Sequence, residues 1–187
     1  MGSLSQQRWP LGAREILSSG ARIVGVAGLL AILTYSLVGG QKPLDEGVPA
    51  PPVEGLRRLD GSLGNLELAQ GRPLVVNIWA TWCAPCLQEL PMFAAAAKEH
   101  GDVGFYGLAV DSDRAQIQAL VARMGITYDI AEIDNATSRA WNATALPSTY
   151  ILDGQGRIRW SVRGQIDRAT LEKHLAPVLE STPPLNE

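Results

Sequence analysis

The chain has 187 residues, 46% of them hydrophobic, and a formal net charge of -3 at pH 7. This length suggests one domain with appendages. The charge, together with the lack of a basic stripe interleaved with aromatic residues, gives no reason to expect a nucleic-acid partner. Only 2 cysteines are present, and they lie together in one CxxC motif, so a framework of structural disulfides is excluded.

The first 40 residues predict a membrane anchor. Residues 1–22 are a polar, arginine-bearing leader, and residues 23–38 are uncharged and mostly apolar. With the two glycines that follow, the apolar run approaches the roughly 20 residues that span a bilayer. The basic leader predicts a cytoplasmic N-terminus and an extracytoplasmic remainder. We therefore expect a cytoplasmic leader and a single transmembrane helix over residues 23–40.

Two alternatives for this segment stay open. A cleaved signal peptide is the nearer one, because Val38 and Gly40 weakly suit a cleavage site, although the leader is long and no A-x-A precedes the site. A buried core helix is the other, and the proline-bearing stretch after the run argues against it. No cysteine follows the run directly, so a lipoprotein is excluded. Residues 41–52 contain four prolines and predict an extended linker that holds a domain off the membrane.

Apolar runs and turn residues predict an α/β domain over residues 53–180 and a flexible tail over 181–187. The predicted elements are strands at 53–59, 63–68 and 74–79, a helix at 83–99, a strand at 105–110, a helix at 113–124, a strand at 128–133, helical turns at 136–143, a hairpin of strands at 148–152 and 157–162, and a helix at 167–179. We expect Asp111 or Ser112 to cap the second helix and Asp167 to cap the last one.

The chemistry is concentrated in Val75–Pro91, VVNIWATWCAPCLQELP. A buried strand and a short polar turn lead into a CxxC at a helix start. Unpaired amide N–H groups and the positive end of the helix stabilise a thiolate at Cys83. Cys86 follows one turn later, within disulfide reach. The pair can therefore change between dithiol and disulfide with little movement of the backbone.

The residues Trp82–Cys86, WCAPC, resemble the WCxxC active site of the thioredoxin superfamily. The surrounding NIWATWC and ELP resemble the membrane-anchored TlpA/ResA/CcmG branch of thiol–disulfide oxidoreductases. The resemblance covers roughly residues 52–179. It implies a thioredoxin fold, with a central mixed sheet flanked by helices, an N-terminal hairpin and an inserted helix–strand element at residues 113–143.

The resemblance also implies thiol–disulfide exchange through a mixed disulfide. Cys83, exposed at the helix start, is the expected attacking thiolate, and the more buried Cys86 is the expected resolving thiol. Trp82 is expected to contact the substrate. Ala84 and Pro85 are expected to set the backbone of the motif.

Leu146 and Pro147 form the second element of the expected site, directly before a predicted strand. The resemblance implies a cis proline at position 147, with neighbouring backbone that pairs with an incoming peptide, and a substrate-facing Leu146. Taken by itself, the sequence favours the alternative of a trans proline that opens a strand.

Glu89 lies three residues after Cys86 and therefore on the same helix face. The resemblance implies that it lies near the active site. If it is buried, its pKa rises and it can carry the proton of Cys86; the alternative is a solvated helix acid. Asn77 stands where thioredoxins carry a buried aspartate. Because asparagine cannot ionise, this chain needs another base or water.

We interpret the chain as a single-pass protein of a bacterial inner membrane with its catalytic domain in the periplasm. The expected activity is reduction of protein disulfides, as in cytochrome c maturation, with a membrane electron donor of the DsbD/CcdA type. Protein thiols and disulfides are the expected substrates. No cofactor beyond the redox-active disulfide and no metal is expected.

Other functions for the CxxC stay open. A thiol oxidant or disulfide isomerase of the same fold is the nearest alternative, and a copper-binding metallochaperone module is another. A peroxidase is conceivable for the superfamily, but its cysteine usually lacks the WCxxC context. Zinc is disfavoured because there is no second cysteine pair, and c-type haem because Leu87 stands where a histidine is needed.

Overall fold

The computed structural model describes residues 44 and 46–182, which fall within one compact unit. The predicted leader and transmembrane helix, and residues 183–187 of the predicted tail, lie outside the described residues. Within residues 44 and 46–182, no helix is both long and apolar enough to span a bilayer.

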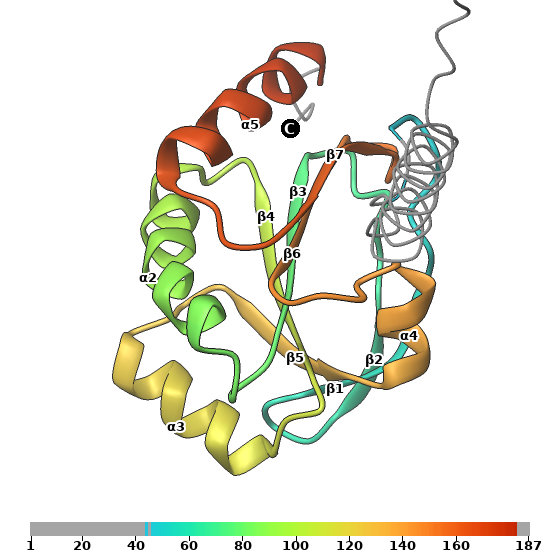
Figure 1. The fold of residues 1–187 in the computed structure, drawn as a ribbon. Coiled ribbons are helices and arrows are strands. Elements are labelled where there is room, and N and C mark those ends of the chain that lie inside the picture. The colour runs from blue at the N-terminus through green and yellow to red at the C-terminus, as the bar shows by residue number, and fades with distance from the viewer. Residues whose placement is uncertain (1–43, 45, 183–187) are drawn as a thin grey trace, which may run out of the picture. The chain divides into compact units, whose positions relative to one another are not determined.

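The described residues form a sheet flanked by helices (Figure 1). The strands are β1 (Val53–Arg58), β2 (Leu63–Leu66), β3 (Leu74–Trp79), β4 (Gly104–Val110), β5 (Asp129–Ile133), β6 (Ser148–Leu152) and β7 (Ile158–Arg163). The helices are α2 (Ala84–Glu99), α3 (Arg114–Met124), α4 (Asn135–Ala140) and α5 (Arg168–Ser181). These bounds agree with the predicted elements to within a few residues.

The sheet has the order β2-β1-β5-β4-β3-β6-β7. Strand β4 runs parallel to β3 and β5, whereas β6 is antiparallel to β3 and to β7. The N-terminal hairpin joins the sheet through the antiparallel pairing of β1 with β5. The predicted mixed sheet and thioredoxin fold are thereby confirmed, with α3 and β5 as the inserted helix–strand element.

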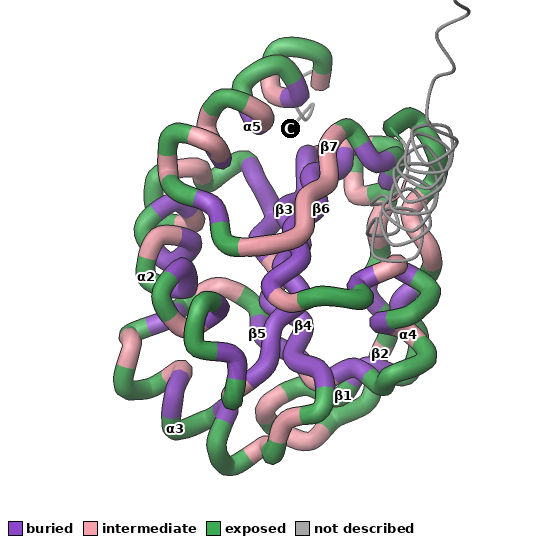
Figure 2. Tube along the Cα trace, in the orientation of Figure 1, coloured by how far each residue is buried: buried purple, intermediate pink, exposed green. Residues whose placement is uncertain are grey.

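Strand β3 is at the centre of the core because both of its faces are covered. Helices α2, α3 and α5 cover one face and α4 lies on the other (Figure 1). All residues of β3 are buried, and the inner strands are buried along most of their length (Figure 2). A strand buried on both faces is apolar without alternation, which explains the continuous apolar run that identified it. The carboxyl end of β3 carries the CxxC turn into α2.

Helix caps account for the starts of α3 and α5. The Asp113 carboxylate accepts a hydrogen bond from the N–H of Gln116 at 3.1 Å, so the predicted cap at Asp111 or Ser112 is wrong by one or two residues. Asp167 caps α5 as predicted and accepts from the N–H of Thr170 at 2.8 Å. Asp111 and Ser112 instead remain in the turn after β4, where they reach the active site.

The second half of the predicted linker is attached to the domain. Gly47 N–H donates to the Ile158 carbonyl at 2.7 Å, and Ile158 N–H donates to the Val48 carbonyl at 2.9 Å. These bonds cover part of the outer edge of β7, which would otherwise present unpaired backbone groups. Gly47 and Val48, which lie within the predicted linker, are therefore hydrogen-bonded to the edge of the sheet.

Candidate active site

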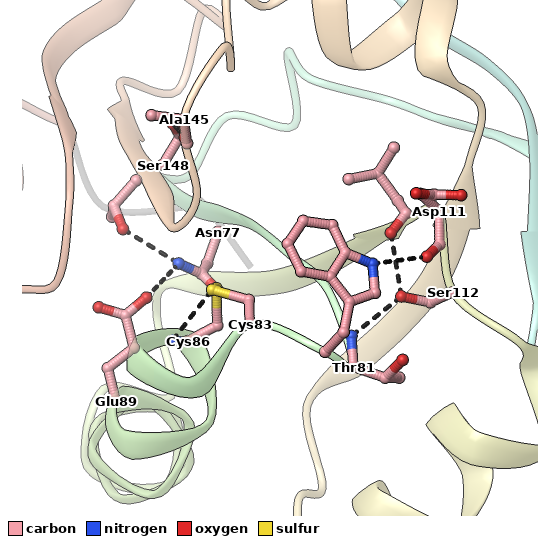
Figure 3. Close-up of a disulfide and its surroundings, with 12 residues drawn as sticks. Asn77, Thr81, Cys83, Cys86, Glu89, Asp111, Ser112, Ala145 and Ser148 are labelled. Atoms are coloured by element: carbon pink, nitrogen blue, oxygen red, sulfur yellow. Dashed lines mark hydrogen bonds between the residues drawn. A yellow bond between two sulfur atoms is a disulfide. The ribbon is translucent and has the colours of Figure 1, made fainter.

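Cys83 and Cys86 are joined by a disulfide at the start of α2 (Figure 3). Cys83 is the N-cap residue, and its Sγ accepts a hydrogen bond from the Cys86 N–H at 3.3 Å. Ala84 and Pro85 form the first helical turn, where the missing N–H of proline removes no helix hydrogen bond. The predicted strand–turn–CxxC–helix arrangement is present, and it directs the Cys86 amide of the first helical turn at the sulfur of Cys83.

Cys83 is less accessible than predicted. Its residue exposure is 5%, against 0% for Cys86, so the expectation of an exposed Cys83 is wrong for the disulfide form, although the order of the two is right. The reason is that Cys83 lies in a hydrophobic cluster against which Leu146 packs. Leu146 thus packs against the same cluster that buries Cys83.

A groove of about 540 Å³ opens beside the disulfide. Trp82, Cys83, Ala84 and Pro85 form part of its lining, and Leu146 forms another part. The Leu146–Pro147 peptide bond is cis, as the resemblance implied, and Pro147 is buried while Leu146 is half-buried. The structure thus brings Trp82 and Leu146, predicted from distant parts of the sequence, to one groove.

The lining of the groove also includes residues that sequence reasoning missed. They are Asp111 after β4, Asn135 and Ser138 of α4, and Thr144 after α4. No local pattern linked them to the CxxC, because Asp111 follows β4 and the others come from α4 or the segment after it, all distant from the CxxC in the sequence. Among the described residues, no group of three or more His, Cys, Asp or Glu is placed to hold a metal ion.

The turn after β4 holds Trp82 in place. The Trp82 indole N–H donates to the Asp111 carbonyl at 2.9 Å, and Asp111 has a left-handed φ of 47°. Ser112 Oγ accepts from the Thr81 N–H at 3.0 Å and donates to the Val110 carbonyl at 2.9 Å. Trp82 is 64% exposed, yet its indole is fixed at one end by this hydrogen bond, so less side-chain entropy is left to lose in a contact with another molecule.

Replacing Trp82 with alanine is expected to raise KM for a protein disulfide about tenfold, since loss of an exposed aromatic anchor costs about 1–2 kcal/mol. A small-molecule disulfide, which makes fewer contacts with the groove, is expected to respond less. Steady-state kinetics with both substrates measure this. The matched control is Leu63→Ala, which removes a side chain of similar exposure, 66%, from β2 at the outer edge of the sheet. Equal effects of the two changes would contradict a substrate-binding role for Trp82.

Glu89 is buried, with 1% exposure, so the alternative of a solvated helix acid is wrong. The Asn77 amide donates to Glu89 Oε1 at 2.8 Å, and the Ile166 N–H donates to Oε2 at 3.1 Å. Burial raises the pKa of Glu89 to about 7, although both hydrogen bonds favour the ionised form and lower it. The Glu89 carboxylate, Asn77 and the disulfide lie close together at the N-terminal turns of α2 (Figure 3). A buried carboxyl that titrates near neutral pH is suited to accept and return a proton.

Comparison with known proteins agrees with this geometry. The model of the AhpC/TSA family matches residues 47–161. The thioredoxin-like protein YneN of Bacillus subtilis is 30% identical over 173 residues, which are 90% of this chain and 97% of YneN. The thiol:disulfide interchange protein DsbE of Xylella fastidiosa is 29% identical and covers 84% of this chain and 83% of its own. The crystal structure of a DsbF homologue from Corynebacterium diphtheriae superposes with a TM-score of 0.63 at 26% identity, over 74% of this chain and 94% of its own.

Proposed function

The chain belongs to the AhpC/TSA family and is a thioredoxin-like thiol–disulfide oxidoreductase, and we propose that it works as a reductase of protein disulfides. The observation that carries the activity is the Cys83–Cys86 disulfide at a helix N-terminus, beside a groove bordered by Trp82 and Leu146. The reductive direction is supported by the resemblance to the TlpA/ResA/CcmG branch.

In the proposed reaction, the Cys83 thiolate attacks one sulfur of a substrate disulfide. A mixed disulfide forms, and the other substrate sulfur leaves as a thiolate that takes up a proton. Cys86 then loses its thiol proton and attacks the Cys83 sulfur, which releases the second substrate thiolate. Two electrons pass to the substrate, and the enzyme is left with the Cys83–Cys86 disulfide seen in the structure.

We assign the proton of Cys86 to Glu89. Glu89 lies three residues further along α2, is buried, and has a pKa of about 7. Asn77 cannot accept this proton because its amide does not ionise; it orients the carboxylate instead, with a hydrogen bond of 2.8 Å. Glu89 therefore replaces the base that a strand aspartate supplies in ordinary thioredoxins.

The proposed setting is the periplasmic side of a bacterial inner membrane, with residues 23–40 as the anchor. A reductase outside the cytoplasm needs electrons from across the membrane, so we propose a donor of the DsbD/CcdA type. Apocytochrome c with its CxxCH cysteines oxidised to a disulfide is the proposed substrate, and its CxxCH dithiol is the product. The names of the relatives, thiol:disulfide interchange protein DsbE and thiol-disulfide oxidoreductase ResA, support a protein thiol or disulfide as substrate.

The redox state of the cysteine pair in cells tests the direction. Acid quenching followed by alkylation with a mass tag is expected to show Cys83 and Cys86 mostly reduced, and oxidised after the membrane donor is deleted. The pair is the only thiol source in the chain, which has 2 cysteines, so the tag reports it directly. A pair that is oxidised with and without the donor would refute the reductase and favour the thiol oxidant.

A further inference from the structure

A chain of hydrogen bonds joins Glu89 to the strand that follows Pro147. The Asn77 side-chain amide uses its two N–H groups for different partners. One N–H donates to Glu89 Oε1 at 2.8 Å, and the other to Thr149 Oγ1 at 3.1 Å (Figure 3 shows Glu89 and Asn77). Thr149 lies in β6, two residues beyond Pro147, and is fully buried. A single amide thus connects the proposed base to one side of the loop that borders the groove.

A second chain joins Glu89 to Pro147 itself. The Ile166 N–H donates to Glu89 Oε2 at 3.1 Å in a buried environment. Two residues earlier, the Gly164 N–H donates to the Pro147 carbonyl at 2.8 Å. Gly164 has a φ of +98°, which favours glycine and lets the chain turn from β7 toward α5. The two chains together form a closed ring that includes Glu89, and we call it the Glu89 ring. Its members are Glu89, Asn77, Thr149, Pro147, Gly164 and Ile166.

The ring has one unused acceptor. Asn77 Oδ1 is buried and has no hydrogen-bond partner within residues 44 and 46–182. The arrangement fits an ionised Glu89, because a carboxylate only accepts and the amide must turn its N–H groups toward it. A protonated Glu89 gains an O–H that needs an acceptor. Both groups bonded to the carboxylate are N–H donors, so Asn77 Oδ1 can accept this O–H only after the amide turns over.

We propose that the Asn77 amide is a positioning switch that turns over when Glu89 takes up a proton and thereby releases its hydrogen bond to Thr149. In the turned state, Oδ1 accepts from the Glu89 O–H and Nδ2 no longer faces Thr149 Oγ1. The consequence for catalysis rests on the proposed function. Glu89 takes up the proton of Cys86 as the mixed disulfide resolves, so the strand beside Pro147 loosens when the reduced product must leave.

In the oxidised protein, the other titratable groups around Glu89 do not change protonation near neutral pH. Tyr128, before β5, interacts electrostatically with Glu89, but burial and the Glu89 charge raise its pKa far above neutral. Cys83 and Cys86 are held as a disulfide and do not titrate. The other partners of the ring are amides and a hydroxyl. A change near neutral pH in this region therefore reports Glu89.

Nuclear magnetic resonance of the oxidised full-length chain in detergent tests the switch. The Glu89 carboxyl carbon, the Asn77 side-chain amide and the Thr149 backbone amide are followed between about pH 5 and about pH 9. All three are expected to shift with one midpoint near the Glu89 pKa of about 7. In Glu89→Gln, the Asn77 and Thr149 signals are expected not to titrate. An Asn77 signal that stays constant while Glu89 titrates would overturn the proposal.

Three further variants separate the Asn77–Thr149 link from general effects. Thr149→Val keeps the branched shape but removes Oγ1, so the Thr149 response is expected to vanish; Thr149→Ser keeps the hydroxyl and the response. Glu99→Gln removes a carboxylate from the exposed end of α2 and is expected to leave the Asn77 titration unchanged. A full response in Thr149→Val would refute the link. Exchange activity is measured separately from the titration. A static Asn77 in an active reductase refutes the switch alone, and a switching Asn77 in an inactive protein refutes the proposed function alone.

Discussion

Replacing Cys86 with serine is expected to trap the protein on its substrate. Cys83 can still attack, but the mixed disulfide has no resolving thiol, so turnover is expected to fall by at least about a thousandfold. Cys86 is fully buried and lies within the disulfide of Cys83, so no substrate thiol replaces it easily. Gel electrophoresis without reductant, after acid quenching of cells, measures the trapped species.

The reverse variant, Cys83→Ser, is the control for this experiment. It is expected to lose the same activity without accumulating a mixed disulfide, because Cys86 is buried at 0% exposure and cannot meet a protein substrate. Both variants keep the helix start intact, since serine is a good N-cap residue and is tolerated in the first turn. Mixed disulfides trapped equally by the two variants would show that Cys83 is not the attacking residue.

Replacing Glu89 with glutamine is expected to remove most of the pH dependence of stability near neutral pH. The folded-state pKa of Glu89 is raised from 4.5 to about 7. Between these values the folded protein holds a proton that the unfolded chain has lost, so stability is greatest below about pH 4.5 and decreases as pH rises through about 7. The full loss is up to about 3 kcal/mol. Denaturant unfolding of the oxidised protein at about pH 5 and about pH 8 measures it.

The same variant tests the chemistry. The rate of the resolving step in the wild-type protein is expected to rise with pH around 7, where Glu89 becomes a base, and this rise is expected to disappear in Glu89→Gln. Glu99→Gln is the control, since the Glu99 side chain is 62% exposed on the same helix. If Glu89→Gln kept the wild-type profile of both stability and rate, Glu89 would have no role as proton carrier.

Local sequence determined the elements and the redox motif. The continuous apolar run of β3 and the helical spacing of α3 are signals within a few residues, and their predicted bounds agree with the structure. The position of the CxxC at the start of α2 could also be predicted locally, because the residues that begin a helix lie next to one another in the sequence. The cap of α3 was misplaced by one or two residues, since Asp111, Ser112 and Asp113 all have capping side chains.

The tertiary structure decided which side chains surround the motif. Glu89 is buried because Asn77 of β3 and the backbone of Ile166 after β7 close over it, and these residues are 12 and 77 positions away in the sequence. Its pKa follows from that burial and not from its neighbours in the chain. Helical spacing placed Glu89 on the face of Cys86, but it could not distinguish a buried base from a solvated acid.

The groove beside the disulfide was likewise beyond local reasoning. Cys83 lies in a hydrophobic cluster against which Leu146, more than sixty positions later, also packs, so the sequence overestimated the exposure of Cys83. The docking of Gly47 and Val48 on β7 joins segments more than one hundred positions apart. The sequence by itself therefore determined the reactive group and the order of the elements, because both follow from short-range patterns. Only the fold decided burial, proton affinity and access, because these depend on contacts between segments that are far apart in the chain.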